Sequence, residues 1–401
     1  MASPVASSPL DSGKRRLTEL LRLFLRLGVT AFGGPAAHVA LMEDEVVRRR
    51  GWLSREAFLD LVGATNLIPG PNSTELALHI GLQRAGWRGL LTAGVAFIAP
   101  SAFLVAGLAF GYQRWGRLPA ALAIFAGIKA VMIAVIVQAL VSLSRTAVKS
   151  TWLAGIGVLA LLAVLWGIPE IAVLVVAGAM SAFARKGAPP VRPPPPTAPA
   201  KRGFVPGAEA LVAGLGTTTG AGVVVAGQVP LTLFAVFLKI GFLVFGSGYV
   251  LLAFLRNELV VARAWITEAQ LIDAVAAGQV TPGPLFTAAT FIGYLIAGGW
   301  GALLATVAIF LPAFLLVAAS GTLLPRLRQS HRAGAFLDGV NVASLALMTV
   351  VTGQLVRAAV VDVVSLVLAA TSAALLIWRR LNPGWLVLLG AAVGLIRAAI
   401  A

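Results

Sequence analysis

A Pro-Gly-Pro tripeptide interrupts apolar sequence at two places in this chain. The first lies in NLIPGPNSTELALHIG, starting at Asn66, and the second lies in GQVTPGPLFTAATFIG, starting at Gly278. Proline lacks the backbone N–H donor and glycine weakens helices, so each tripeptide ends one helix and lets another begin. The residues of the two breaks are Pro69, Gly70, Pro71, Pro282, Gly283 and Pro284.

The two breaks belong to an internal duplication. At an offset of 213, Trp52 aligns with Trp265, and FLRLGVTAFGG at 24–34 aligns with FLKIGFLVFGS at 237–247. After the breaks the offset falls to 212, where Pro100 aligns with Pro312. Tryptophan, proline and glycine stay in register on both sides of the break, so the chain consists of two homologous halves.

Composition places these halves in a membrane. Hydrophobic residues make up 59% of the chain and charged residues only 11%, unlike a soluble globular protein. We therefore predict an all-α polytopic membrane protein. Several windows have the length of about 20 apolar residues that a bilayer span requires. Examples are Leu90–Tyr112, Leu118–Leu143, Leu231–Phe254, Leu303–Leu324 and Gly334–Leu355.

A proline-rich stretch separates the halves. Residues 185–203 read RKGAPPVRPPPPTAPAKRG, a composition that favours extended backbone in water, with basic residues typical of the cytoplasmic side. We predict an N-terminal repeat at 17–184, a Pro-rich cytoplasmic linker with an unassigned small-residue segment at 185–229, and a C-terminal repeat at 230–398. The N-terminus lacks the pattern of a cleaved signal peptide, so we expect the first helix to be retained.

The sequence of each half predicts about five transmembrane helices and one helical hairpin that is broken at Pro-Gly-Pro. The hairpin arms, 55–68 and 72–85 in the first half, are short, which favours a re-entrant pair. A hairpin adds an even number of crossings to the five others, so the second half is predicted to be inverted relative to the first. Most Lys/Arg clusters then fall in the cytoplasm, although the cluster at 14–16 falls outside.

The break can serve as an anion site. Non-helical backbone at membrane depth lies in a protein interior or a polar cavity, and a helix beginning there offers unpaired N–H groups and a positive dipole end. The alternative is a tight turn at the membrane surface. Polar candidates for substrate binding flank the breaks: Asn66, Asn72, Ser73, Thr74, Gln279 and Thr287.

Two cations at repeat-equivalent positions strengthen the anion-site interpretation. Arg26 aligns with Lys239, each in the first helix of its half and shortly before a glycine-rich break. A charged side chain in a membrane helix faces a cavity or a partner, although Arg26 could instead extend to the interface. Lys129 is a third candidate cation. The glycine breaks contain Gly33, Gly34, Gly246 and Gly248.

Two further groups of charged residues have other candidate roles. Glu75 and His79 lie one helical turn apart on the first hairpin and could relay a coupling proton; alternatively, Glu75 pairs with an arginine and His79 only packs. Glu45 and Glu258 precede the hairpins in predicted loops, each followed by an arginine and a tryptophan. We interpret these two carboxylates as structural or gating residues.

These motifs together resemble the chromate ion transporter family in its two-repeat, full-length form. The resemblance rests on FGGP and FGSG, the segments of Trp52 and Trp265, and the two Pro-Gly-Pro hairpins, and it leaves out the linker. It implies transport of chromate, with sulfate as a similar dianion, in the bacterial inner membrane. It also implies efflux that confers chromate resistance, with membrane lipids and a homodimer as candidate partners.

The sequence disfavours several other classes of protein function. The chain has no cysteine and only three histidines, His38, His79 and His331, so no thiolate or recognised metal motif is present. We therefore predict no metal, no cofactor and no enzymatic activity. The net charge of +16 lies mostly at the ends of apolar segments, which disfavours nucleic-acid binding. The alternative function is an intramembrane enzyme or flippase that handles a lipid phosphate headgroup.

Overall fold

The computed structural model describes residues 9–31, 34–65, 68–116, 118–184, 229–244, 250–329, 331–379, 381 and 383–400. The described residues form helices and contain no strand. In the first half the helices are α1 (Pro9–Thr30), α2 (Gly34–Glu43), the π-helical η1 (Asp44–Arg49), α3 (Arg55–Thr65), α4 (Asn72–Trp115), α5 (Pro119–Ala147), α6 (Thr151–Leu165) and α7 (Glu170–Ala184).

The second half repeats this order of helices. Its elements are α8 (Val229–Leu243), α9 (Leu251–Leu255), the π-helical η3 (Arg256–Val261), α10 (Glu268–Val280), the short 3-10 helix η4 (Leu285–Thr287), α11 (Ala288–Gln329), α12 (His331–Ala359), α13 (Val363–Arg379) and α14 (Pro383–Ile400). The predicted linker and the small-residue segment lie outside the described residues, apart from Val229, which begins α8.

Five of the described helices are long and apolar enough to cross a membrane: 72–115, 119–147, 285–320, 332–359 and 383–400. Four shorter apolar helices, α6, α7, α8 and α13, accompany them. The prediction of one continuous span over Leu231–Phe254 was wrong, because α8 ends at Leu243 and α9 begins at Leu251. Val244, the residue after α8, is not helical, and its carbonyl accepts a hydrogen bond from the N–H of Gly70 in the other half.

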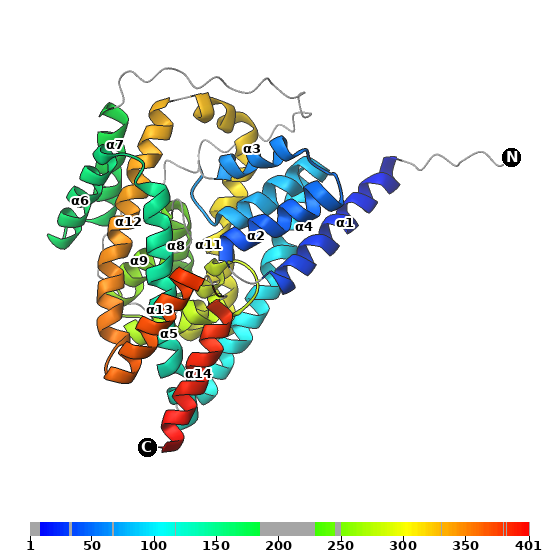
Figure 1. The fold of residues 1–401 in the computed structure, drawn as a ribbon. Coiled ribbons are helices and arrows are strands. Elements are labelled where there is room, and N and C mark those ends of the chain that lie inside the picture. The colour runs from blue at the N-terminus through cyan, green and yellow to red at the C-terminus, as the bar shows by residue number, and fades with distance from the viewer. Residues whose placement is uncertain are drawn as a thin grey trace.

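The two halves are inverted relative to each other. In Figure 1, α5 (teal) rises from the end of the molecule where the C-terminus lies, while its counterpart α12 (orange) descends toward that end. The halves are also interleaved, because α13 and α14 pack against α5 while α6 and α7 pack against α12. Each half therefore covers the long helix of the other, and the predicted inverted repeat is confirmed.

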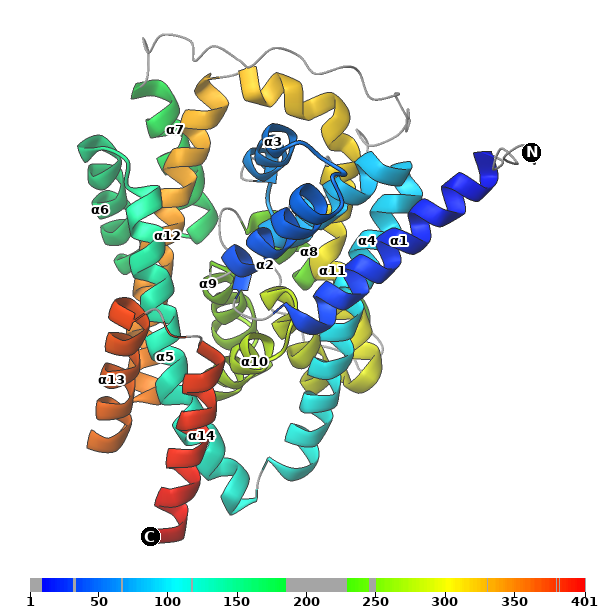
Figure 2. The ribbon, with the colours of Figure 1, turned by 45° about the vertical axis from the view of Figure 1, so that its right-hand side comes forward.

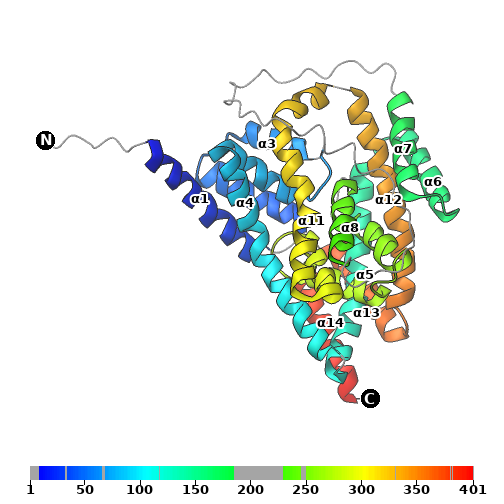
Figure 3. The ribbon, with the colours of Figure 1, turned by 180° about the vertical axis from the view of Figure 1, so that it is seen from behind.

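Packing within each half follows the same symmetry. Helix α1 lies along α4 (Figure 2), and its counterpart α8 lies along α11 (Figure 3). Helices α4 and α11 also pack against each other. The pairs α1–α4 and α8–α11 are therefore joined at the centre, where the Pro-Gly-Pro breaks lie.

The hairpins take the predicted two-armed form. In α4 the helical backbone is interrupted at Ala85 and Gly86, with φ of −144° and 63°, so the second arm ends where the sequence predicted. In α11 the interruption falls at Ala297 and Gly298, with φ of −142° and 60°. Only glycine adopts such a positive φ without strain, which explains why a glycine occupies each corner.

Candidate functional site

The tips of the two hairpins exchange backbone hydrogen bonds with the opposite halves. The N–H of Gly70 donates to the carbonyl oxygen of Val244 at 2.8 Å, and the N–H of Gly283 donates to that of Ala31 at 3.0 Å. Ala31 and Val244 are repeat-equivalent, since they differ by the offset of 213. Each tip thus reaches the end of the first helix of the other half, so both breaks lie inside the protein.

Both tip glycines adopt backbone conformations that require glycine. The φ of Gly70 is 141° and that of Gly283 is 102°, in the region that side-chain-bearing residues avoid. Space is also limited, because a Cβ on Gly70 would collide with Oε1 of Glu75, and one on Gly283 would lie 2.7 Å from the Cβ of Ser101. The Pro-Gly-Pro motif is therefore matched to this tight contact between the halves.

The first tip buries polar groups at the start of α4. Ser73, Thr74 and Glu75 have 2%, 0% and 0% of their surface exposed, and Asn72 is the first residue of the helix. The hydroxyl of Thr74 and both carboxylate oxygens of Glu75 have no hydrogen-bond partner among the described residues. Burying a polar group without a hydrogen-bond partner costs free energy. The hydroxyl of Thr74 and the carboxylate of Glu75 could therefore still form hydrogen bonds at this tip.

The second tip contains hydroxyl groups instead of a carboxylate. Thr287 Oγ1 lies 3.0 Å from Ser101 Oγ and donates to the carbonyl of Pro284 at 2.8 Å. Thr287 is fully buried, and the offset of 212 makes it the counterpart of Glu75. Ser101 was not among the predicted residues; its position beside the duplicated Pro100 was the only sequence signal. The tips are symmetric in backbone but not in charge.

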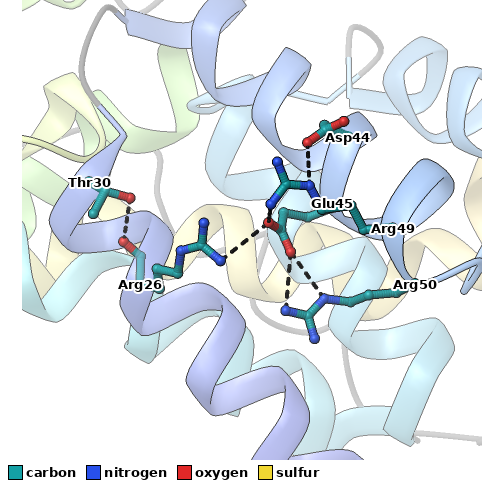
Figure 4. Close-up of polar contacts among 6 residues, drawn as sticks. All are labelled: Arg26, Thr30, Asp44, Glu45, Arg49 and Arg50. Carbon is teal, nitrogen blue, oxygen red and sulfur yellow. Dashed lines mark hydrogen bonds and ion pairs between the residues drawn. The ribbon is translucent and has the colours of Figure 1, made fainter.

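Arg26 is held by a carboxylate on the next element of the same half. Its Nη1 lies 3.4 Å from Oε1 of Glu45, whose side chain is only 7% exposed. Arg49 and Arg50 contact the same carboxylate, at 3.2 and 3.1 Å, and Arg49 also binds Asp44 at 2.7 Å. Figure 4 shows the three guanidinium groups around Glu45. Three positive charges therefore meet two negative charges in this cluster.

The second half builds an equivalent cluster. Nζ of Lys239 donates to Oε1 of Glu258 at 2.5 Å, while Arg263 binds the other carboxylate oxygen. Arg263 also lies over the ring of Trp265, 5.6 Å from its centroid, as Arg50 lies over Trp52 at 5.2 Å. The repeat relation that aligned these residues in sequence therefore holds in space.

The two carboxylates lie in π-helical turns, η1 and η3, so the prediction that Glu45 and Glu258 occupy loops was wrong. Widened turns of this kind occur frequently at functional sites. In these turns the N–H groups of Arg50 and Ala262 bond five residues back, to the carbonyls of Glu45 and Asn257. Each glutamate contacts the cation on the first helix of its half.

The structure places the predicted cations on the two helices whose ends contact the tips, but it pairs each with its own glutamate and not with the other cation. Arg26 is five residues before Ala31, and Lys239 is five residues before Val244, a rise of about 7.5 Å along a helix. Their side chains are 59% and 45% exposed in the isolated chain. Each cation thus lies roughly one and a half turns from the contact with the opposite tip.

Lys129 belongs to a different group. Its Nζ lies 3.2 Å from Oδ2 of Asp273, and the hydroxyl of Tyr112 donates to the same oxygen at 2.9 Å. This group joins α4, α5 and α10. Lys129 was predicted to bind substrate together with Arg26 and Lys239. In the structure it instead forms an ion pair with Asp273 in another part of the protein.

The remaining predicted residues have the following positions. His79 is buried in α4 one turn after Glu75, Gln279 lies in the last turn of α10, and Gly34 begins α2. Among the described residues, no group of three or more His, Asp or Glu side chains could hold a metal ion. Four predicted residues lie outside the described residues: Gly33, Asn66, Gly246 and Gly248.

Interleaved inverted halves, broken hairpins that meet at the centre, and duplicated cations define a multi-pass membrane transporter of the inverted-repeat class. A protein-family model described as "Chromate transporter" matches residues 18–182 and 231–395. The chain belongs to the chromate transporter family, and it is a transporter rather than an enzyme. No solved structure matches the chain.

Curated relatives agree over nearly the whole chain. A chromate transport protein of Cupriavidus metallidurans is 31% identical over 385 residues, covering 95% of this chain and 93% of that protein. A chromate transport protein of Pseudomonas aeruginosa is 32% identical over 396 residues, covering 92% of each. An uncharacterized transporter of Methanocaldococcus jannaschii is 24% identical and also covers 92% of each chain.

Proposed function

We propose that the protein exports chromate across the bacterial inner membrane and so confers chromate resistance. The anion is held between the two hairpin tips, with Arg26 and Lys239 supplying positive charge. Sulfate, a tetrahedral dianion of similar size, is the second candidate cargo. The proposal takes the cargo from the names of the relatives in Cupriavidus metallidurans and Pseudomonas aeruginosa.

One duplicated relationship carries this proposal. In each half, a cation on the first helix is paired with a glutamate, buried for Glu45 and partly buried for Glu258, and lies five residues before the carbonyl that receives the opposite hairpin tip. A dianion between the tips would have one such cation on each side. The hairpin helices begin there, and helix N-termini favour bound anions.

Hydroxyl and amide groups at the tips provide further ligands. Ser73 and Thr74 are buried in the first turn of α4, and Thr287 is buried at the second tip. The proposed ligand set adds Asn66, Asn72 and Gln279 as amide donors. Lys129 is paired with Asp273, so it does not belong to the resting form of this set.

In the proposed cycle, Glu45 and Glu258 act as built-in competitors of the cargo. Each carboxylate forms an ion pair with a cation that the dianion would bind, and Glu45 is buried. The arriving anion displaces the carboxylates from Arg26 and Lys239, and the carboxylates keep their existing ion pairs with Arg50 and Arg263. The glutamates keep the cations paired while the site is empty and release them when cargo enters, which fits the gating role expected for them.

The membrane potential alone can drive export. Moving one charge through 100 mV is worth about 2.3 kcal/mol, so a dianion leaving an inside-negative cell gains about 4.6 kcal/mol. This energy supports a concentration ratio of roughly three powers of ten. Uptake would instead require co-transported cations, for which Glu75 and His79 are the candidate proton relay.

Flux measurements in proteoliposomes test the proposal. Purified protein would be reconstituted, a potential of either sign imposed, and labelled chromate and sulfate followed. Wild type is expected to move chromate in the direction set by the potential, with Lys239→Gln and Arg26→Gln each lowering the rate at least tenfold. Arg15→Gln is the matched control, because Arg15 pairs with Glu19 on the same helix as Arg26 but its side chain is 83% exposed.

The outcomes separate the alternatives. Loss of flux in both variants, with normal folding and an unchanged control, supports the site. Absence of chromate and sulfate flux in folded wild type would reject the proposed cargo. In that case, movement of a labelled phospholipid between leaflets by the same vesicles would favour the lipid-phosphate alternative.

A further inference from the structure

A cavity of about 410 Å³ lies apart from the hairpin tips. It is bounded by the end of α4, the start of α5, the end of α12, the start of α13 and the end of α14. These helix ends gather at the end of the molecule that carries the C-terminus (Figure 1). Asp362 and Arg397 form an ion pair among its lining residues near the helix ends, and Lys129, Tyr112 and Asp273 line it deeper.

Asp273 combines an ion pair with an unused oxygen. Its Oδ2 accepts from Tyr112 and faces Lys129, whereas Oδ1 is buried and has no hydrogen-bond partner among the described residues. The side chain is 1% exposed, while that of Lys129 is 20% exposed. Lys129 lies ten residues into α5, about 15 Å along the helix. The pair is therefore deep, although the cavity reaches it.

This group is not duplicated, unlike the elements of the anion site. The repeat relation pairs Asp273 with Asp60, which is exposed on α3, and pairs Lys129 with Asn341 on α12. An element present in only one of two symmetric halves is not required by the symmetry of the anion site. A separate role for the pair is therefore indicated.

We propose that Asp273 is a proton-exchange site that controls the charge of Lys129. A hydronium ion in the cavity transfers its proton to Oδ1 of Asp273, forming an O–H bond, and leaves as water. The carboxylate becomes a neutral carboxylic acid, so the ion pair is lost and Lys129 remains as an uncompensated ammonium at the cavity. The local charge rises from zero to plus one.

The freed ammonium is a binding point for a compact oxyanion on its way through the protein. This step rests on the proposed function, because it takes the cargo to be a dianion. Proton and anion then favour each other's binding, as linkage requires, and the complex of dianion and proton carries one net negative charge. An inside-negative potential still drives that complex outward.

The other charged groups at the cavity do not act as the proton-exchange site. A backbone hydrogen bond from Ser365, aided by Arg397, lowers the pKa of Asp362 to about 2, so this carboxylate stays ionised between pH 5 and 8. Arg397 remains charged over the same range, and Tyr112 is a donor to Asp273. Asp273 is thus the buried carboxylate at the cavity, and it lies against the partly buried cation Lys129.

Infrared difference spectroscopy tests the proton site without any cargo. Purified protein would be acidified stepwise, and the carbonyl band of a protonated carboxylic acid recorded. Wild type is expected to show a band that Asp273→Asn lacks and that the matched control Asp60→Asn keeps. Asp273→Asn leaves Lys129 unpaired, so the double variant Asp273→Asn with Lys129→Gln provides a neutral pair if the single variant fails to fold.

Linkage to the cargo is measured in proteoliposomes with the membrane potential clamped at zero. For wild type and Asp60→Asn, a difference of one pH unit should shift the steady-state ratio of labelled chromate about tenfold, as expected for one coupled proton. For Asp273→Asn and the double variant, the ratio should not change with pH. The anion should flow away from the acidic side.

Each outcome decides between the hypotheses. The inference would be overturned if Asp273→Asn kept both the infrared band and the tenfold shift. It would also be overturned if only Glu75→Gln lost the band and the shift, because the proton would then belong to the first hairpin. If wild type moves no chromate yet shows the Asp273 band, the proposed function fails while the proton site stands. If chromate moves but no such band exists, only the proton site fails.

Discussion

The backbone N–H of Gly70 donates a hydrogen bond to the carbonyl oxygen of Val244, 2.8 Å away. This bond joins the break of the first half to the end of the first helix of the second half, and its counterpart runs from Gly283 to Ala31. The last four carbonyls of a helix have no partner within the helix, so the end of each first helix is free to accept the N–H of the opposite tip.

Adding a methyl group at either tip should disrupt this exchange. Gly70→Ala and Gly283→Ala each force a side chain into a positive-φ conformation and into contact with Glu75 or Ser101. We expect a loss of about 1–3 kcal/mol in unfolding free energy and at least a tenfold loss of flux, measured by denaturation in detergent and in proteoliposomes. Gly63→Ala, in helix α3 of the same hairpin, has open space around it and should not destabilise the protein, because alanine favours a helix more than glycine does; equal damage there would contradict this explanation.

Neutralising a competing carboxylate should strengthen anion binding. In Glu45→Gln the negative charge beside Arg26 and Arg50 is removed, so sulfate should bind roughly tenfold more tightly, about 1.4 kcal/mol, while turnover falls. Binding is reported by the part of the tryptophan fluorescence change that is lost in Trp52→Phe, because Arg50 lies over the ring of Trp52. Asp44→Asn is the control, because Asp44 contacts Arg49 alone among the cluster's arginines; an equal gain there would point to a general charge effect.

Removing the buried carboxylate of the first tip should stabilise the protein and impair transport. Glu75 is fully buried, and its oxygens lack hydrogen-bond partners among the described residues. Burying a charge costs more than burying a neutral amide, so Glu75→Gln should raise the unfolding free energy and lower the chromate flux. Thermal unfolding and flux would be compared with those of Glu56→Gln, an exposed glutamate on α3. A destabilised Glu75→Gln would mean that the carboxylate has a structural partner.

The two halves should assemble when expressed as separate chains. Each half alone leaves the long helix α5 or α12 without its covering pair, so residues 1–200 and 201–401 should each be unstable alone but co-purify when expressed together. Gly127→Leu should abolish co-purification, because a Cβ there would collide with the backbone of Gly390. Gly155→Leu, which has open space, should not. Stable separate halves would contradict the interleaved packing.

Much of the architecture was predictable because it depends on local residue types. The arms of the first hairpin were predicted to end near Ala85, and the helix breaks at Ala85 and Gly86, because glycine permits the reversal. The prediction of a continuous span over Leu231–Phe254 was wrong, since hydrophobicity alone does not show that α8 ends at Leu243 and α9 begins at Leu251.

The sequence by itself determined the membrane class, the duplication and the positions of the breaks, because composition, spacing and proline or glycine chemistry are properties of short segments. Only the tertiary structure decided which groups meet. Ser101 and Thr287 are 186 residues apart, and Tyr112 and Asp273 are 161 apart. Such contacts depend on how inverted halves interleave, which no local pattern encodes. The fold therefore pairs Lys129 with Asp273 and leaves Arg26 and Lys239 to the two glutamates.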